Sequence, residues 1–125
     1  MLEFHATAVE TYVGEFNILI VHFDDEGGRY LQFQVPEELD DPRDFEPGYG
    51  SVGVEINDQL FSGSNCFSAA ELERGRFRLV LARKAKLTER FGEVIVTFDL
   101  DDVAFAELRR GLERAFRDFP GFRAP

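Results

Sequence analysis

The sequence contains very little sulfur and no tryptophan. Its 125 residues include one cysteine, one methionine and no tryptophan. Because Cys66 stands alone, an intrachain disulfide and a metal site built on several cysteines are both excluded. No apolar run approaches the roughly 20 residues that span a bilayer, and the N-terminus lacks a basic start followed by an apolar block. These absences predict a cytosolic protein with no membrane partner.

Positive charge is scarce in the first half of the chain. Residues 1–60 carry 14 Asp and Glu against 2 Arg, a formal charge of −12, whereas residues 61–125 carry 10 against 12, a charge of +2. A concentrated acidic surface attracts basic partners and repels nucleic acid and anionic membranes. The charge pattern therefore predicts a surface that binds protein, with no nucleic-acid partner.

Phenylalanine is abundant, with 14 copies in a chain that is 44% hydrophobic and 30% charged. Phenyl rings bury much apolar area and have no polar group to satisfy, so they predict an ordered core. A chain of this length is long enough for one core and short for two. We therefore expect one domain over residues 1–125.

Period-two alternation of apolar residues dominates the first hundred positions and predicts six or seven antiparallel strands. Asp24 to Gly28 has the composition of a hairpin turn, and Asn57-Asp58 that of a second turn. We expect an irregular acidic loop over about residues 36–50. The expected strands lie within residues 2–8, 16–23, 31–35, 52–56, 59–67, 77–81 and 94–98.

The C-terminal segment has helical periodicity, because Phe105, Leu108, Leu112 and Phe116 recur at spacings of three and four. We expect a helix over residues 102–119, capped by Asp99 or Asp101 and ended by Pro120-Gly121. Its apolar stripe has to pack on one face of the sheet. The predicted fold class is α+β.

No residue pattern predicts catalysis. The Gly48–Gly53 segment has the spacing of a phosphate loop, but a strand follows it where such a loop requires a helix. His5 and His22 have no partners at metal-ligand spacing, and Cys66 has no assignable base. We therefore predict no catalytic residue, no metal and no cofactor, and a protein that is not an enzyme.

The candidate partner-binding residues come from the acidic loop and the strand after it. Six carboxylates lie between Glu37 and Glu46, with Arg43 as the one basic residue among them. Such a run either contacts a cationic partner or keeps the chain soluble. The candidates are Asp40, Asp41, Asp44, Glu46, Tyr49, Glu55, Asn57 and Gln59.

Several features between Tyr49 and Phe116 together resemble immunity protein family 10. They are Tyr49 ahead of a strand, Val54-Glu55, Gln59, Ser62-Gly63, Leu72, strands at Phe77–Leu81 and Val94–Phe98, and a closing helix with Phe105, Leu108 and Leu112. The resemblance implies a small cytosolic antidote of a bacterial polymorphic toxin system. Such a protein neutralises a cognate toxin by occupying its active site or a nearby surface.

Two classes of function stay open at this point. The first is a non-catalytic antidote for a toxin domain, for instance a nuclease, whose substrate cleft has to be basic. The second is a small accessory or ligand-binding domain in which sheet and helix enclose a phenylalanine-lined pocket. The residues do not fix the toxin, its contacts or the oligomeric state.

Overall fold

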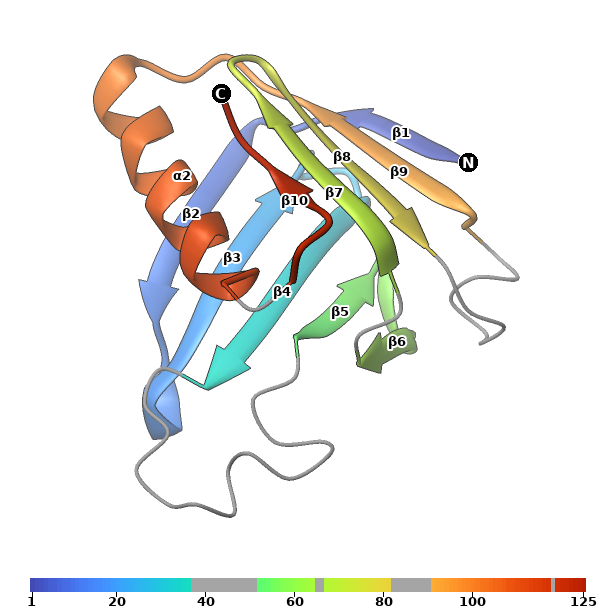
Figure 1. Cartoon of the computed structure of the whole chain (residues 1–125). Helices are drawn as coiled ribbons and strands as arrows, with labels where there is room; N and C mark the ends of the chain where they lie inside the picture. Colours follow the sequence, from blue (N-terminus) through green and yellow to red (C-terminus); the bar gives the residue numbers. More distant parts are fainter. Residues whose placement is uncertain (37–51, 65–66, 82–90, 118) are drawn as a thin grey trace.

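The computed structural model describes residues 1–36, 52–64, 67–81, 91–117 and 119–125. Within these ranges the chain forms ten strands, a 3-10 turn η1 (Glu15–Asn17) and the helix α2 (Asp102–Ala115). The strands belong to two five-stranded sheets that face each other, with α2 alongside β2 and β3 (Figure 1). The α+β class predicted from the sequence is confirmed.

One sheet, which we call sheet B, follows chain order and is antiparallel throughout. Its strands are β2 (Ala8–Val13), β3 (Ile18–Asp24), β4 (Tyr30–Pro36), β5 (Gly53–Ile56) and β6 (Asp58–Ser64). The other, sheet A, has the order β1-β9-β8-β7-β10, and both of its outermost strands run parallel to their neighbours. Its strands are β1 (Leu2–His5), β7 (Phe67–Glu73), β8 (Arg76–Leu81), β9 (Glu93–Thr97) and β10 (Phe122–Arg123).

The two sheets correct the expectation of a single antiparallel sheet of six or seven strands. Residues 2–8 appeared to be one strand, but the chain passes from one sheet to the other within them. The Ala6 N–H donates to the Thr97 carbonyl at 2.8 Å in sheet A, and the Thr7 N–H donates to the Asp24 carbonyl at 2.9 Å in sheet B. Alternation identifies the buried face of a strand but not its neighbour, so it does not reveal such a crossing.

The two predicted turns occur where the sequence places them. In the β3–β4 hairpin, Asp25 accepts hydrogen bonds from the N–H groups of Gly27 and Arg29 at 2.8 and 3.0 Å, and the bond from Gly27 lowers the pKa of Asp25. Gly28 has a φ of 101°, which glycine adopts without steric cost. Asn57 has a φ of 60° between β5 and β6. Both turns fix the strand pairing around them.

The helix starts as predicted and ends earlier than predicted. Asp101 caps it by accepting a hydrogen bond from the Ala104 N–H at 2.8 Å. It ends at Ala115, four residues before the expected limit of 102–119, because Phe116 has left helical geometry with a φ of −103° and a ψ of 22°. This early end lets the rings of Phe116 and Phe119 pack against Phe67, at 5.1 and 4.8 Å between centroids.

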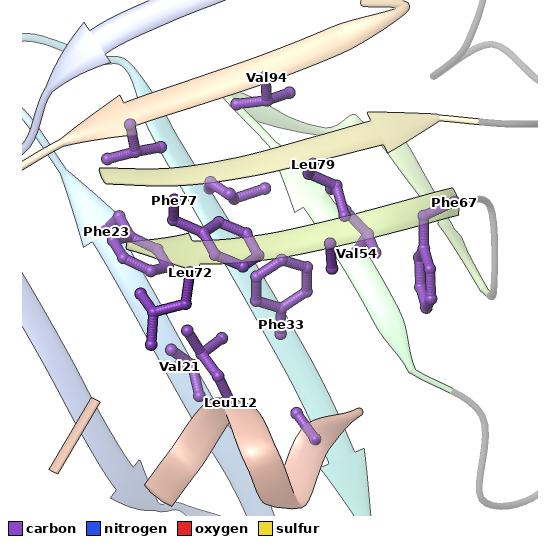
Figure 2. Packing of buried hydrophobic residues seen from close by; sticks show 14 of the residues in the cluster. Val21, Phe23, Phe33, Val54, Phe67, Leu72, Phe77, Leu79, Val94 and Leu112 are labelled. Carbon is purple, nitrogen blue, oxygen red and sulfur yellow. The ribbon is translucent and has the colours of Figure 1, made fainter. Parts of the chain in front are cut away.

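Both sheets and the helix contribute to one hydrophobic cluster (Figure 2). Phe116 lies near its centre, with its ring centroid 5.1 Å from that of Phe33 in sheet B and 6.4 Å from that of Phe77 in sheet A. The helix lies very close to β2, because a Cβ at Gly111 would come within 2.6 Å of Thr11 Cγ2. The core therefore fixes the positions of both sheets, and their outer faces are left for function.

Candidate functional site

The outer face of sheet B carries a row of polar side chains that crosses four strands. Strand pairing places Glu10 opposite His22, His22 opposite Gln32, and Gln32 opposite Glu55. Paired residues of antiparallel strands point to the same face of a sheet. The neighbours of the other three along β3, β4 and β5, such as Phe23, are buried in the core, whereas those of Glu10 on β2 are half-buried. We call these four residues the polar row.

Hydrogen bonds hold most of the polar row in place. His22 Nδ1 lies 2.8 Å from Gln32 Oε1, and His22 Nε2 lies 2.9 Å from Asp24 Oδ2. The Tyr30 ring stacks on His22 at 5.5 Å between centroids, and its hydroxyl donates to Glu55. Burial, followed by this bond to the Glu55 carboxylate, raises the pKa of Tyr30 above its ordinary value. The carboxylates of Asp24 and Glu55 therefore keep fixed positions.

An apolar pair lies beside the polar row on the same face. Tyr12 pairs with Ile20 across β2 and β3, and 47% of Tyr12 is exposed. Both side chains pass over Gly14, since a Cβ there would lie 3.7 Å from Ile20 and 3.8 Å from Tyr12. The outer face of sheet B thus combines an exposed aromatic side chain with ordered polar groups.

The two sheets differ in the number of basic residues that lie near their carboxylates, as the charge pattern of the sequence indicates. The five strands of sheet B contain four carboxylates and no lysine or arginine: Glu10, Asp24, Glu55 and Asp58. On sheet A, by contrast, Arg78 lies 2.8 Å from Glu93 and 3.7 Å from Glu71. Sheet A therefore pairs these two carboxylates with an arginine, whereas the strands of sheet B offer no lysine or arginine and leave a negative face.

The structure brings together two of the eight candidate residues. Glu55 belongs to the polar row, and Asn57 accepts a hydrogen bond from the Tyr30 N–H at 2.8 Å. Gln59 lies in β6, and its side chain is outside the described part of the chain. The remaining five lie outside the described residues: Asp40, Asp41, Asp44, Glu46 and Tyr49.

Sequence reasoning missed His22, Asp24, Tyr30 and Gln32 as members of the site. The signal was present, because the hairpin predicted at 24–28 pairs Asp24 with Tyr30 and His22 with Gln32. His22 lies on the same face of β3 as Ile18 and Ile20. Glu10 and Gln32, its cross-strand partners, lie on that face as well.

Other candidate chemistry receives no support from the described residues. His5 is exposed, and its Nδ1 lies 2.9 Å from Thr97 Oγ1. Within the described ranges, no group of three or more His, Cys, Asp or Glu side chains is arranged to hold a metal. Cys66 lies outside those ranges. In the same part of the chain, no helix is long and apolar enough to cross a membrane.

A groove of about 450 Å³ lies between α2 and the edge of sheet B. Its lining is mostly polar and contains no phenylalanine: Thr11, Leu19, Glu107, Arg110, Gly111 and Arg114. The described phenyl rings of Phe23, Phe33, Phe77 and Phe116 pack on one another in the core. This groove is therefore not the phenylalanine-lined pocket of the alternative function.

The fold and the site define a two-sheet α+β protein with one negative, partly apolar sheet face. The family model described as Immunity protein 10 matches residues 5–106, a range that runs from the end of β1 into α2. The chain belongs to this family, which confirms the resemblance found in the sequence. Neither the curated proteins nor the solved structures gave a match. Membership assigns the chain to the immunity proteins, whose role is the neutralisation of a toxin.

Proposed function

We propose that this chain neutralises one cognate toxin domain by tight one-to-one binding in the cytosol, without turnover. The toxin presents a basic surface, as a nuclease has to present to its substrate. The antidote covers that surface or the active site beside it. The chain forms a single domain in this proposal.

One observation carries the proposal: arginines pair with carboxylates on sheet A, but the strands of sheet B contain no lysine or arginine to do so. Sheet B has four carboxylates and no lysine or arginine in its strands, whereas Arg76 and Arg78 pair with glutamates on sheet A. A surface of one sign accelerates encounter with a surface of the opposite sign. The negative side of the molecule is therefore its partner-facing side.

The acidic segment adds to the same attraction. Asp40, Asp41, Asp44 and Glu46 lie in the connection between β4 and β5, two strands of sheet B, and Tyr49 follows them. In this proposal these residues supply long-range attraction to the basic toxin, since charges of one sign sum. We assign the segment, together with Glu55, Asn57 and Gln59, to the toxin-facing side.

Titration against a toxin tests the proposal. The probe is a candidate toxin domain identified from the genes that neighbour this one, in active form for inhibition and in inactivated form for binding. We expect inhibition to end at one equivalent and the complex to have a 1:1 mass by light scattering. An unrelated toxin domain of similar net charge serves as the control.

Three results would contradict the proposal. Complete inhibition far below one equivalent would indicate turnover. Failure to inhibit or bind at any ratio would remove the antidote role for this pair. Affinity unchanged between 50 and 200 mM salt would remove the basic partner, because exposed charges are screened over this range.

A further inference from the structure

The outer face of sheet B contains both parts that a protein interface needs. Interfaces combine an apolar centre, rich in aromatic side chains, with a polar rim. Tyr12 is 47% exposed and lies opposite Ile20 on the neighbouring strand. Glu10 precedes it by two residues on β2 and points to the same face.

The polar part of this face is already ordered. Tyr30 holds Glu55, while His22 lies between Gln32 and Asp24. Groups fixed before binding lose less conformational entropy on association. Glu10 differs from them, because it is exposed and no described side chain pairs with it. It is the carboxylate best placed to receive a cation from outside.

Charge decides what kind of molecule covers this face. A second copy would bring the same carboxylates together, on chains that each carry a formal charge of −10. Like charges placed opposite each other oppose association. A basic protein surface reverses the sign of that interaction and also covers the exposed tyrosine.

We infer that the toxin docks on the outer face of sheet B, with Tyr12 and Ile20 as the apolar anchor and the polar row as its acidic rim. We call this surface the docking face. The partner segment presents lysine or arginine beside an apolar side chain. This inference rests on the proposed function and names the contact surface within it.

Two substitutions test the docking face, each with a matched control. Tyr12→Ala removes the anchor, and Val103→Ala truncates a residue on α2 that is 71% exposed. Glu10→Lys reverses a charge on the edge strand of sheet B. Glu3→Lys makes the same change at an exposed position on the edge strand of sheet A. All four positions are outside the buried core, and thermal melting confirms folding of each variant.

Binding to the inactivated toxin domain is measured by surface plasmon resonance. We expect Tyr12→Ala to weaken affinity about tenfold or more, mainly through faster dissociation, as central aromatic residues do. Glu10→Lys should slow association about threefold or more at low salt, and added salt should shrink the difference. Both controls should stay within about twofold of wild type.

Hydrogen exchange of the wild-type complex gives a second measurement that needs no variant. Peptides from β2 and β3 should exchange more slowly in the complex, and those from β8 and β9 should not change. Protection confined to sheet A would overturn the inference, as would Tyr12→Ala and Glu10→Lys variants that bind as the controls do. In either case a wild-type chain that still inhibits leaves the antidote proposal standing.

The remaining outcomes are also decisive. A wild-type dimer that becomes monomeric with Tyr12→Ala would show that a second copy covers the face, which overturns the inference. A wild-type chain that fails to bind the toxin domain contradicts the proposed function, and the docking face falls with it.

Discussion

The two sheets of this protein share one core and differ on their outer faces. On sheet A, the half-buried Arg78 lies between Glu71 and Glu93. On sheet B, Asp24 contacts the His22 ring and accepts a hydrogen bond from the Glu26 N–H, and Glu55 accepts one from the Tyr30 hydroxyl. Both sheets thus alternate buried and outward residues, but these two glutamates of sheet A are paired with arginine, whereas the outward carboxylates of sheet B remain a source of negative charge.

This difference has little cost in stability. Exposed ion pairs contribute about 0 to 1 kcal/mol each, so sheet B loses little by lacking them. Hydrogen bonds such as the one from Tyr30 to Glu55 stabilise the carboxylates in their place. A protein can therefore keep one sheet face charged for a partner while its core stabilises the fold.

The largest expected effect tests whether the sheets really share a core. Phe116→Ala removes a buried ring that contacts Phe33 of sheet B and Phe67 and Phe77 of sheet A. We expect a loss of about 3 to 5 kcal/mol in the free energy of unfolding, measured by urea denaturation. Val103→Ala, at an exposed site, is the control. A loss below about 1 kcal/mol would mean that the layers are stabilised separately.

The next effect tests whether location of charge matters more than net charge. Changing Asp40, Asp41, Asp44 and Glu46 to Lys raises the net charge from −10 to −2. We expect association with the toxin domain to slow about tenfold or more at low salt, with little change in melting temperature.

The control for that variant changes Glu3, Asp99, Glu107 and Glu113 to Lys, which gives the same net charge of −2. These four residues are exposed on sheet A, on α2 or beside them. Association should slow less than about threefold. Equal slowing in both variants would show that only the total charge acts.

A smaller effect concerns how sheet B holds its carboxylates. Tyr30→Phe removes the hydrogen bond to Glu55 and should cost about 0.5 to 1.5 kcal/mol at pH 7. Because the pKa of Tyr30 is higher in the folded than in the unfolded state, its contribution is full below about pH 10 and is lost as the pH rises further.

Urea denaturation between pH 7 and 11 checks this prediction. The wild type should lose stability above about pH 10 more steeply than Tyr30→Phe. Tyr12→Phe, on the same face but outside the network, should follow the wild type. Parallel curves for wild type and Tyr30→Phe would show that the hydrogen bond does not shift the titration of Tyr30.

The smallest effect is expected on sheet A. Glu73 pairs with Arg76 at 3.4 Å, and both side chains are exposed. Glu73→Gln should change the free energy of unfolding by less than about 0.5 kcal/mol and leave toxin affinity unchanged. A tenfold loss of affinity would place sheet A in the interface and remove the functional difference between the two sheets.

Local features of the fold were predictable from the sequence, and long-range ones were not. The 24–28 hairpin and the start of the helix depend on neighbouring residues, so local patterns predicted both, with Asp101 as one of two candidate caps. The parallel pairing of Leu2 with Val94 joins residues too distant for any local pattern to reveal. The second sheet was missed for this reason.

In the candidate site, too, the local pairing was predictable from the sequence and the long-range pairing was not. The pairing of His22 with Gln32 follows from the hairpin, but the pairing of Gln32 with Glu55 spans the connection between β4 and β5. No local rule sets the register across such a connection. Glu55 was therefore identified as a candidate without its partners, and Tyr12 was not identified at all.

The parallel strand β1 also bears on how the chain is synthesised. All of sheet B is contained in residues 8–64, whereas β1 has no partner until β9 leaves the ribosome. During that interval the inner side chains of sheet B, such as Phe23 and Phe33, lack the layer that covers them. Exposed phenyl surface of this kind promotes aggregation and recruits chaperones. The order of strands along the chain therefore makes translation of the second half the vulnerable stage in producing a working antidote.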